Sequence, residues 1–189
     1  MLSKFAQNHQ LETIQYIKFF WSLEMRLAEK IQEWIYSLEW EDKIEVDEDN
    51  QTSQVNFKYR INEQSFNVWV ETDEQTDVVK VYIYAPFKVI PKKSQEFALL
   101  LNRINTEIWS GSFIDINGGN ICWRHVVNFA DTDPSIKTID NLFSYGVFVY
   151  QTWFEEISAV ALTKTTAQDI FDELDATSES TDENVPDEI

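Results

Sequence analysis

The chain has 189 residues and a formal net charge of −18, and 43% of its residues are hydrophobic. This length suits one medium-sized domain with appendages, and the apolar content is sufficient for a packed core. The excess of acid argues against binding to nucleic acid or to an anionic membrane surface, because both would repel it. The single cysteine excludes an internal disulfide and fits a reducing compartment, so we expect a soluble cytoplasmic protein.

The N-terminal part of the chain is expected to be helical. Over residues 10–40, apolar side chains recur at spacings of three and four, which predicts one long helix or two abutting helices. The positions concerned are Ile14, Ile17, Trp21, Leu27 or Ala28, Ile31, Ile35 and Leu38.

Three segments between residues 53 and 85 alternate apolar and polar residues, as half-buried strands do. Short polar turns at 62–63 and 72–77 separate them, which predicts an antiparallel meander preceded by a short strand near 43–46. The side chains expected to face the core are Val55, Phe57, Tyr59, Ile61, Phe66, Val68, Val70, Val79, Val81 and Ile83.

The opposite face of this meander is not fully polar, because it carries Trp69, Val78, Tyr82 and Tyr84. Two interpretations stay open: another part of the same chain covers these side chains, or they form a surface for a partner or a second copy. We select Trp69, Tyr82 and Tyr84 as candidate partner-binding residues.

Residues 91–109 are expected to form a second helix, with Pro91 near its start and apolar residues on one face. A hairpin follows over 112–129, in which residues 117–120, Asn-Gly-Gly-Asn, supply the turn. The last helix is predicted to begin with Asp133 as N-cap and Pro134 as its first residue, and to run to about residue 161. Gly146 in its middle costs roughly 1 kcal/mol relative to alanine, which a close approach by another element would explain.

Candidates for chemistry are few. A structural zinc site needs about four Cys or His ligands, whereas this chain has only His9, Cys122 and His125. On a strand, Cys122 and His125 would point to opposite faces, so they cannot share a metal or act as a nucleophile and base. The segment that begins at Asp115 does not match the spacing of a calcium loop. We therefore predict no catalytic, cofactor-binding or metal-binding residues.

The C-terminal segment, residues 164–189, has no Lys or Arg after Lys164 and is rich in Asp and Glu. Such a composition predicts a largely disordered acidic tail. Within it, residues 165–175 could form one or two turns of helix from Thr166, with Thr166 and Asp169 as a capping box. This piece is either an end that docks weakly on the domain or a short, self-inhibitory interaction helix.

Residues 28–162 resemble the YbjN family of bacterial proteins, often described as sensory transduction regulators. The blocks that carry the resemblance are FNVWVETDEQTDVVKVYIYAPFKVIP, ALLLNRINTEIWSGSF with Asn102 and Asn105 in an N-x-x-N pattern, FIDINGGNICWRHVVNF and FSYGVFVYQTWFEEISAV. The resemblance implies an α+β fold similar to class I type III secretion chaperones, with an antiparallel sheet and flanking helices in the order α-β(3-4)-α-β-β-α. The chain then divides into a helical N-terminal extension (1–25), the family domain (26–163) and the acidic tail (164–189).

The resemblance implies no catalytic residue and no cofactor, and links the family to the regulation of stress responses and motility. We therefore expect a non-enzymatic, chaperone-like regulatory protein that binds a partner protein, forms a homodimer, and binds neither nucleic acid nor membrane. A small-molecule sensor or enzyme is the alternative, with Asn102, Arg103, Asn105 and Arg124 as polar groups among aromatic side chains. A purely structural homodimer is a third possibility.

Overall fold

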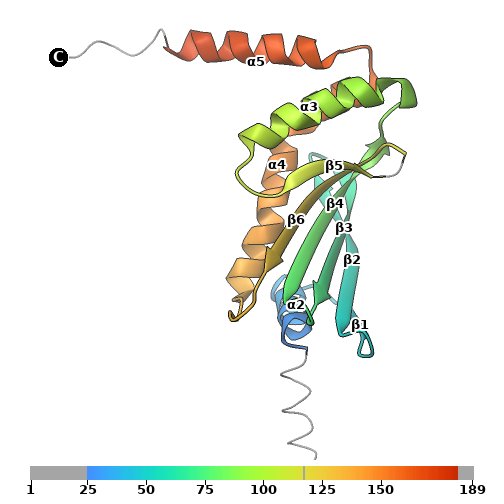
Figure 1. Ribbon diagram of the computed structural model, residues 1–189, viewed down its shortest axis with the longest axis vertical. Helices are drawn as coiled ribbons and strands as arrows, with labels where there is room; N and C mark the ends of the chain where they lie inside the picture. Colours follow the sequence, from blue (N-terminus) through green and yellow to red (C-terminus); the bar gives the residue numbers. More distant parts are fainter. Residues whose placement is uncertain (1–24, 117, 183–189) are drawn as a thin grey trace, which may run out of the picture. The chain divides into compact units, whose positions relative to one another are not determined.

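The computed structural model describes residues 25–116 and 118–182, and the predicted helix over 10–24 lies outside them. The predicted α+β class and element order are confirmed, with one further helix at the C-terminal end (Figure 1). The elements are α2 (Arg26–Ser37), β1 (Glu45–Asp47), β2 (Thr52–Ile61), β3 (Gln64–Asp73), β4 (Val78–Lys88), the 3-10 turn η1 (Pro91–Lys93), α3 (Ser94–Glu107), β5 (Ser112–Ile116), β6 (Asn120–Asn128), α4 (Ile136–Leu162) and α5 (Ala167–Asp182).

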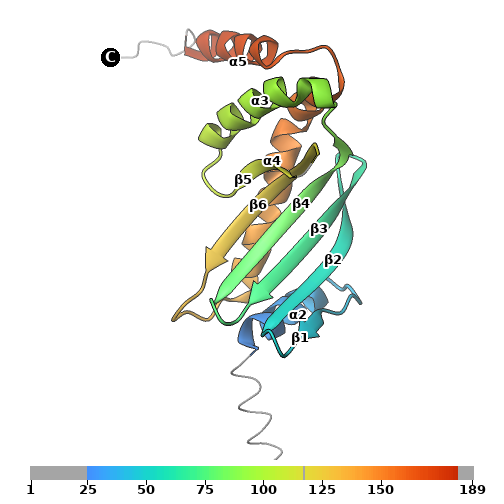
Figure 2. The same ribbon diagram turned by 45° about the vertical axis from the view of Figure 1, so that its right-hand side comes forward.

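The strands form one six-stranded sheet in the order β1-β2-β3-β4-β6-β5, which Figure 2 shows face-on. Strand β1 pairs antiparallel with β2, and β5 pairs antiparallel with β6, with Ile116 opposite Asn120. Both predicted features, the meander and the hairpin, are therefore confirmed. Asn62 and Glu63 both have positive φ angles, as the tight turn between β2 and β3 requires.

The described residues fall into two compact units, and each has its own buried interior. Unit 1 contains residues 25–58, 68–82 and 125–145, and unit 2 contains 59–67, 83–124 and 146–182. In unit 1 the rings of Phe57 and Phe143 lie 6.1 and 5.5 Å from the Trp34 ring of α2. The helix residues that are buried are Leu27, Ala28, Ile31, Trp34 and Ile35.

The start of α2 is held by a carboxylate that is distant in sequence. Met25 gives no side-chain cap, and the Glu74 carboxylate instead accepts hydrogen bonds from the backbone N–H groups of Leu27 and Ala28, at 3.1 and 2.8 Å. Burial raises the pKa of Glu74, although the two backbone donors act in the opposite direction. The position of α2 in unit 1 thus depends on the turn between β3 and β4.

Unit 2 is built around two large side chains, Tyr150 and Trp123, both fully buried. The Tyr150 hydroxyl donates a hydrogen bond of 2.9 Å to the Ile83 carbonyl oxygen. A Cβ atom added at Gly146 would lie 2.5 Å from two carbons of the Trp123 ring. The close approach predicted for Gly146 is therefore confirmed, and its partner is Trp123.

The predicted start of the last helix is wrong by two residues. Helix α4 begins at Ile136, so neither Asp133 nor Pro134 has the predicted place. Ser135 is the cap instead, because its hydroxyl oxygen accepts a hydrogen bond of 3.1 Å from the Thr138 N–H.

Helix α5 is longer than the one or two turns predicted, since it runs from Ala167 to Asp182. The predicted capping box is confirmed: Asp169 accepts from the Thr166 N–H at 2.7 Å, and Thr166 accepts from the Asp169 N–H at 3.1 Å. No helix within the described ranges is both long and apolar enough to cross a membrane.

Candidate functional site

In unit 1 the two faces of the sheet differ in what covers them. On β3, Val68 and Val70 are buried against the layer that contains α2, whereas Trp69 and Glu71 are half-buried on the opposite face. Strand β4 repeats the pattern, with Val79 and Val81 buried while Lys80 and Tyr82 are half-buried. We call the second face, which carries Trp69, Glu71, Lys80 and Tyr82, the outer face.

Trp69 and Tyr82 are neighbours on the outer face. Strand β3 ends at Asp73 and β4 begins at Val78, and the Lys80 Nζ lies 3.9 Å from the Glu71 Oε2, as expected if Glu71 and Lys80 are opposite each other. Because the strands of a hairpin run in opposite directions, the residue two positions before Glu71 lies beside the residue two positions after Lys80. These are Trp69 and Tyr82, so two of the three candidate partner-binding residues come together in unit 1.

The third candidate, Tyr84, belongs to unit 2. Its side chain is half-buried and makes a hydrogen bond with the Cys122 thiol, so it has a role within its own unit.

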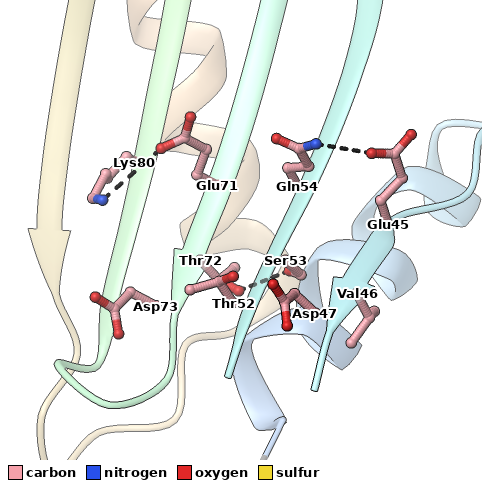
Figure 3. Close-up of a pocket in the computed structure, with 10 residues that line it drawn as sticks. All are labelled: Glu45, Val46, Asp47, Thr52, Ser53, Gln54, Glu71, Thr72, Asp73 and Lys80. Carbon is pink, nitrogen blue, oxygen red and sulfur yellow. Dashed lines mark hydrogen bonds and ion pairs between the residues drawn. The ribbon is translucent and has the colours of Figure 1, made fainter. Parts of the chain in front are cut away.

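A pocket of about 460 Å³ opens on the sheet across strands β1 to β4 (Figure 3). Its lining includes Glu71 and Lys80, each two residues along its strand from the aromatic pair. Glu45, Asp47, Glu71 and Asp73 contribute carboxylates, and Lys80 is the sole cation of its lining. The rest of the lining consists of Val46, Thr52, Ser53, Gln54 and Thr72. In Figure 3 the Gln54 amide reaches across to Glu45, to which its nitrogen donates at 2.8 Å.

Local hydrogen bonds lower the pKa of two of these carboxylates. The side chain and backbone of Asn50 donate to Asp47, at 2.7 and 3.1 Å, and lower its pKa. Hydrogen bonds from Thr76 and Gln75 lower the pKa of Asp73, although burial acts in the opposite direction. The pocket is thus anionic at neutral pH and suits a cationic group.

Sequence reasoning missed this pocket. Its acids lie in the segments EVDEDN and ETDEQTD, which look like ordinary turns of an acidic chain. Pairing of β1 with β2, and of β3 with its two neighbours, brings them to one end of the sheet. In the described ranges, no group of three or more His, Cys, Asp or Glu is arranged to hold a metal ion.

The two residues considered for catalysis, Cys122 and His125, do not form a common site. Cys122 is fully buried, and burial raises the pKa of its thiol to about 12. His125 is half-buried, and burial lowers its pKa. Both lie on the regular strand β6, where a separation of three places them on opposite faces.

The Cys122 thiol should not react with alkylating reagents in the folded protein. We expect no alkylation by iodoacetamide at about pH 8.5, where a free cysteine is half ionised, because the thiolate is the reacting form. Full alkylation should follow unfolding in guanidinium, with mass spectrometry as the readout. Rapid alkylation of the native chain would contradict this prediction.

The polar groups of the small-molecule alternative are also dispersed. The Asn105 side chain makes two hydrogen bonds with the Phe113 backbone, at 2.7 and 3.0 Å. Its role is therefore structural. Arg103 lies 3.3 Å from Glu107, and both Asn102 and Arg124 are exposed. None of these residues lines the pocket on the sheet.

Comparison with known proteins identifies the family. The family model YbjN, described as "Putative bacterial sensory transduction regulator", matches residues 27–159. The chain belongs to the YbjN family. The resemblance found in the sequence is therefore confirmed over nearly the same residues.

Among solved structures, the chain is similar to one titled "Crystal structure of YbjN, a putative transcription regulator from E. coli". The two are 11% identical, with a TM-score of 0.43, and the match covers 68% of this chain and 91% of the other. No curated protein matches the chain. By its description, the YbjN family consists of regulatory proteins.

Proposed function

We propose that this YbjN-family protein is a non-enzymatic regulator that binds a partner protein through the outer face of unit 1. The observation that carries the proposal is the pairing of Trp69 and Tyr82 beside a pocket with four carboxylates. Aromatic side chains surrounded by polar groups are typical of the centre of a protein interface. The family description supports a regulatory role over a catalytic one.

The charge of the pocket indicates the chemistry of the partner. Its carboxylates face a single ammonium group, and the whole chain has a net charge of −18. A partner segment with Lys or Arg beside an apolar residue would satisfy both parts of the surface, because a guanidinium can pair with a carboxylate and stack on Trp69. Two copies of the same acidic pocket would repel each other, so a homodimer would use a different surface.

Trp69→Ala should weaken binding of the partner about tenfold, which corresponds to about 1.4 kcal/mol, because truncation removes an aromatic contact at the interface centre. The partner is first identified by a photo-crosslinking amino acid placed at Tyr82 in the native cell. Its affinity for the purified protein is then measured by calorimetry, at low and at high salt.

Trp109→Ala is the matched control, because Trp109 is 81% exposed and lies in unit 2. It should leave the affinity unchanged, whereas high salt should weaken binding to the unmodified chain. Equal losses for the two tryptophan variants, or an affinity that does not depend on salt, would refute the proposed surface. The melting temperature of each variant shows that the fold is retained.

A further inference from the structure

Helix α5 runs alongside α3 in unit 2. The Glu96 Oε2 accepts a hydrogen bond of 3.1 Å from the Ala167 N–H, and further along both helices the Arg103 Nη2 lies 3.8 Å from the Asp175 Oδ1. The contacts occur in the same order on the two helices, which therefore run parallel (Figure 1).

The start of α5 is buried in this position. Ala167 is 1% exposed and Ile170 is 6% exposed, and Phe171 and Leu174 are half-buried, so the first two turns of the helix pack into unit 2. The fit is nevertheless incomplete, because a pocket of about 380 Å³ remains between α5 and α4. It is lined by Glu155, Glu156 and Ala159 of α4 and by Ile170, Glu173 and Leu174 of α5.

The charges around this pocket do not match. Glu155 and Glu156 of α4 face Glu173 of α5, and the Oε2 atom of Glu156 is buried with no hydrogen-bond partner in the described part of the chain. Burial, followed by the charges of Glu155 and Glu173, raises the pKa of Glu156. A buried carboxylate oxygen without a donor is costly, so Glu156 opposes the docking of α5, whereas the side chains of Glu155 and Glu173 are exposed.

Two cations of unit 2 contact α5 or the residues just before it, but neither lines this pocket. The Lys93 Nζ donates a hydrogen bond of 2.6 Å to the Thr165 carbonyl oxygen, before the helix begins. Arg103 of α3 lies between Glu107 and Asp175. The docked α5 thus has well-placed apolar residues and a carboxylate, Glu173, where the receiving surface favours a cation.

We propose that α5 is a displaceable occupant of a helix-binding groove formed by α3 and α4, and that the groove binds an amphipathic helix of a partner protein carrying Lys or Arg where α5 presents Glu173. Such a helix would keep the apolar contacts of Ile170 and would add a charge-assisted hydrogen bond to Glu156. Helix α5 then limits access to the groove. This inference does not depend on the outer-face site, which lies in unit 1.

Peptides of the α5 sequence, residues 165–182, test the groove on the full chain. A fluorescent peptide with Glu173→Lys should bind at least tenfold more tightly than the unchanged sequence. Asp172→Lys is the matched control, since it makes the same change of charge at the neighbouring residue, which is also exposed but does not line the pocket, and it should give no such gain. Replacing Glu156 with glutamine in the full chain should reduce the preference for the Glu173→Lys peptide.

Hydrogen exchange distinguishes displacement from attachment elsewhere. Binding of the Glu173→Lys peptide should remove protection from the α5 amides of the full chain. The same substitution made within the full chain should instead increase that protection. Equal binding of the two lysine peptides, no binding of either, or binding with α5 still protected would overturn the proposal. So would a dimer in sedimentation caused by Glu173→Lys in the chain, because the occupant would then be a second copy.

Discussion

Gly146→Ala should lower the free energy of unfolding by about 2 kcal/mol, although alanine is the better helix former. Alanine gains about 1 kcal/mol in helix propensity, whereas overpacking of a buried site costs up to about 3 kcal/mol. The added methyl group would lie 2.5 Å from the Trp123 ring and 2.7 Å from the Ile83 Cδ1. The ring cannot easily move away, because Gly111 lies against its opposite edge, where an added Cβ atom would be only 2.6 Å from the ring.

Urea unfolding of the variant measures this loss, and Ser144→Ala is the control on an exposed position of the same helix. In a Trp123→Leu background, Gly146→Ala should cost much less, because the smaller side chain leaves room for the methyl group. A Gly146→Ala variant as stable as the original chain would show that the ring does not press on the helix.

Arg26→Ala should also destabilise the protein, by about 2 kcal/mol, because it leaves several acceptors without their donor. The Arg26 guanidinium bonds Asp77 and the carbonyl oxygens of Phe129 and Thr132, at 2.6, 2.9 and 2.6 Å respectively. The side chain is only 25% exposed, so solvent screens these contacts in part. One residue thereby ties the start of α2 to two loops of unit 1.

Arg26→Lys should recover less than half of the loss, because an ammonium cannot reach the same acceptors as a planar guanidinium. Arg60→Ala is the matched control: its side chain is 76% exposed beside Glu63, and its removal should change stability by less than about 0.5 kcal/mol. Thermal and urea unfolding give the comparison. Equal effects of Arg26→Ala and Arg60→Ala would contradict the anchoring role of Arg26.

The inner face of the sheet could be predicted because strand periodicity is local. Phe66, Val68, Val70, Val81 and Ile83 are all buried, as their alternation with polar residues predicts. The capping box at the start of α5 was predictable for the same reason, since Thr166 and Asp169 satisfy each other within one turn.

The start of α4 was not predictable, because local chemistry offers two equivalent caps. Asp133 followed by Pro134 is as good a start as Ser135 in isolation. In the folded chain the second cap is used, because the Ser135 hydroxyl accepts from the Thr138 N–H and the Ser135 carbonyl oxygen accepts from the Ile139 N–H.

By itself, the sequence determined the α+β class, the order of the elements, the family and the residues that face the core, because each rests on patterns within a few residues or on blocks that resemble the family. The tertiary structure alone decided the two candidate surfaces. Carboxylates from β1 and β3 line one pocket, and α4 and α5 bring Glu156 and Glu173 to another. In a chain so rich in acid, no local signal marks which carboxylates will meet, because strand pairing and helix docking set their distances.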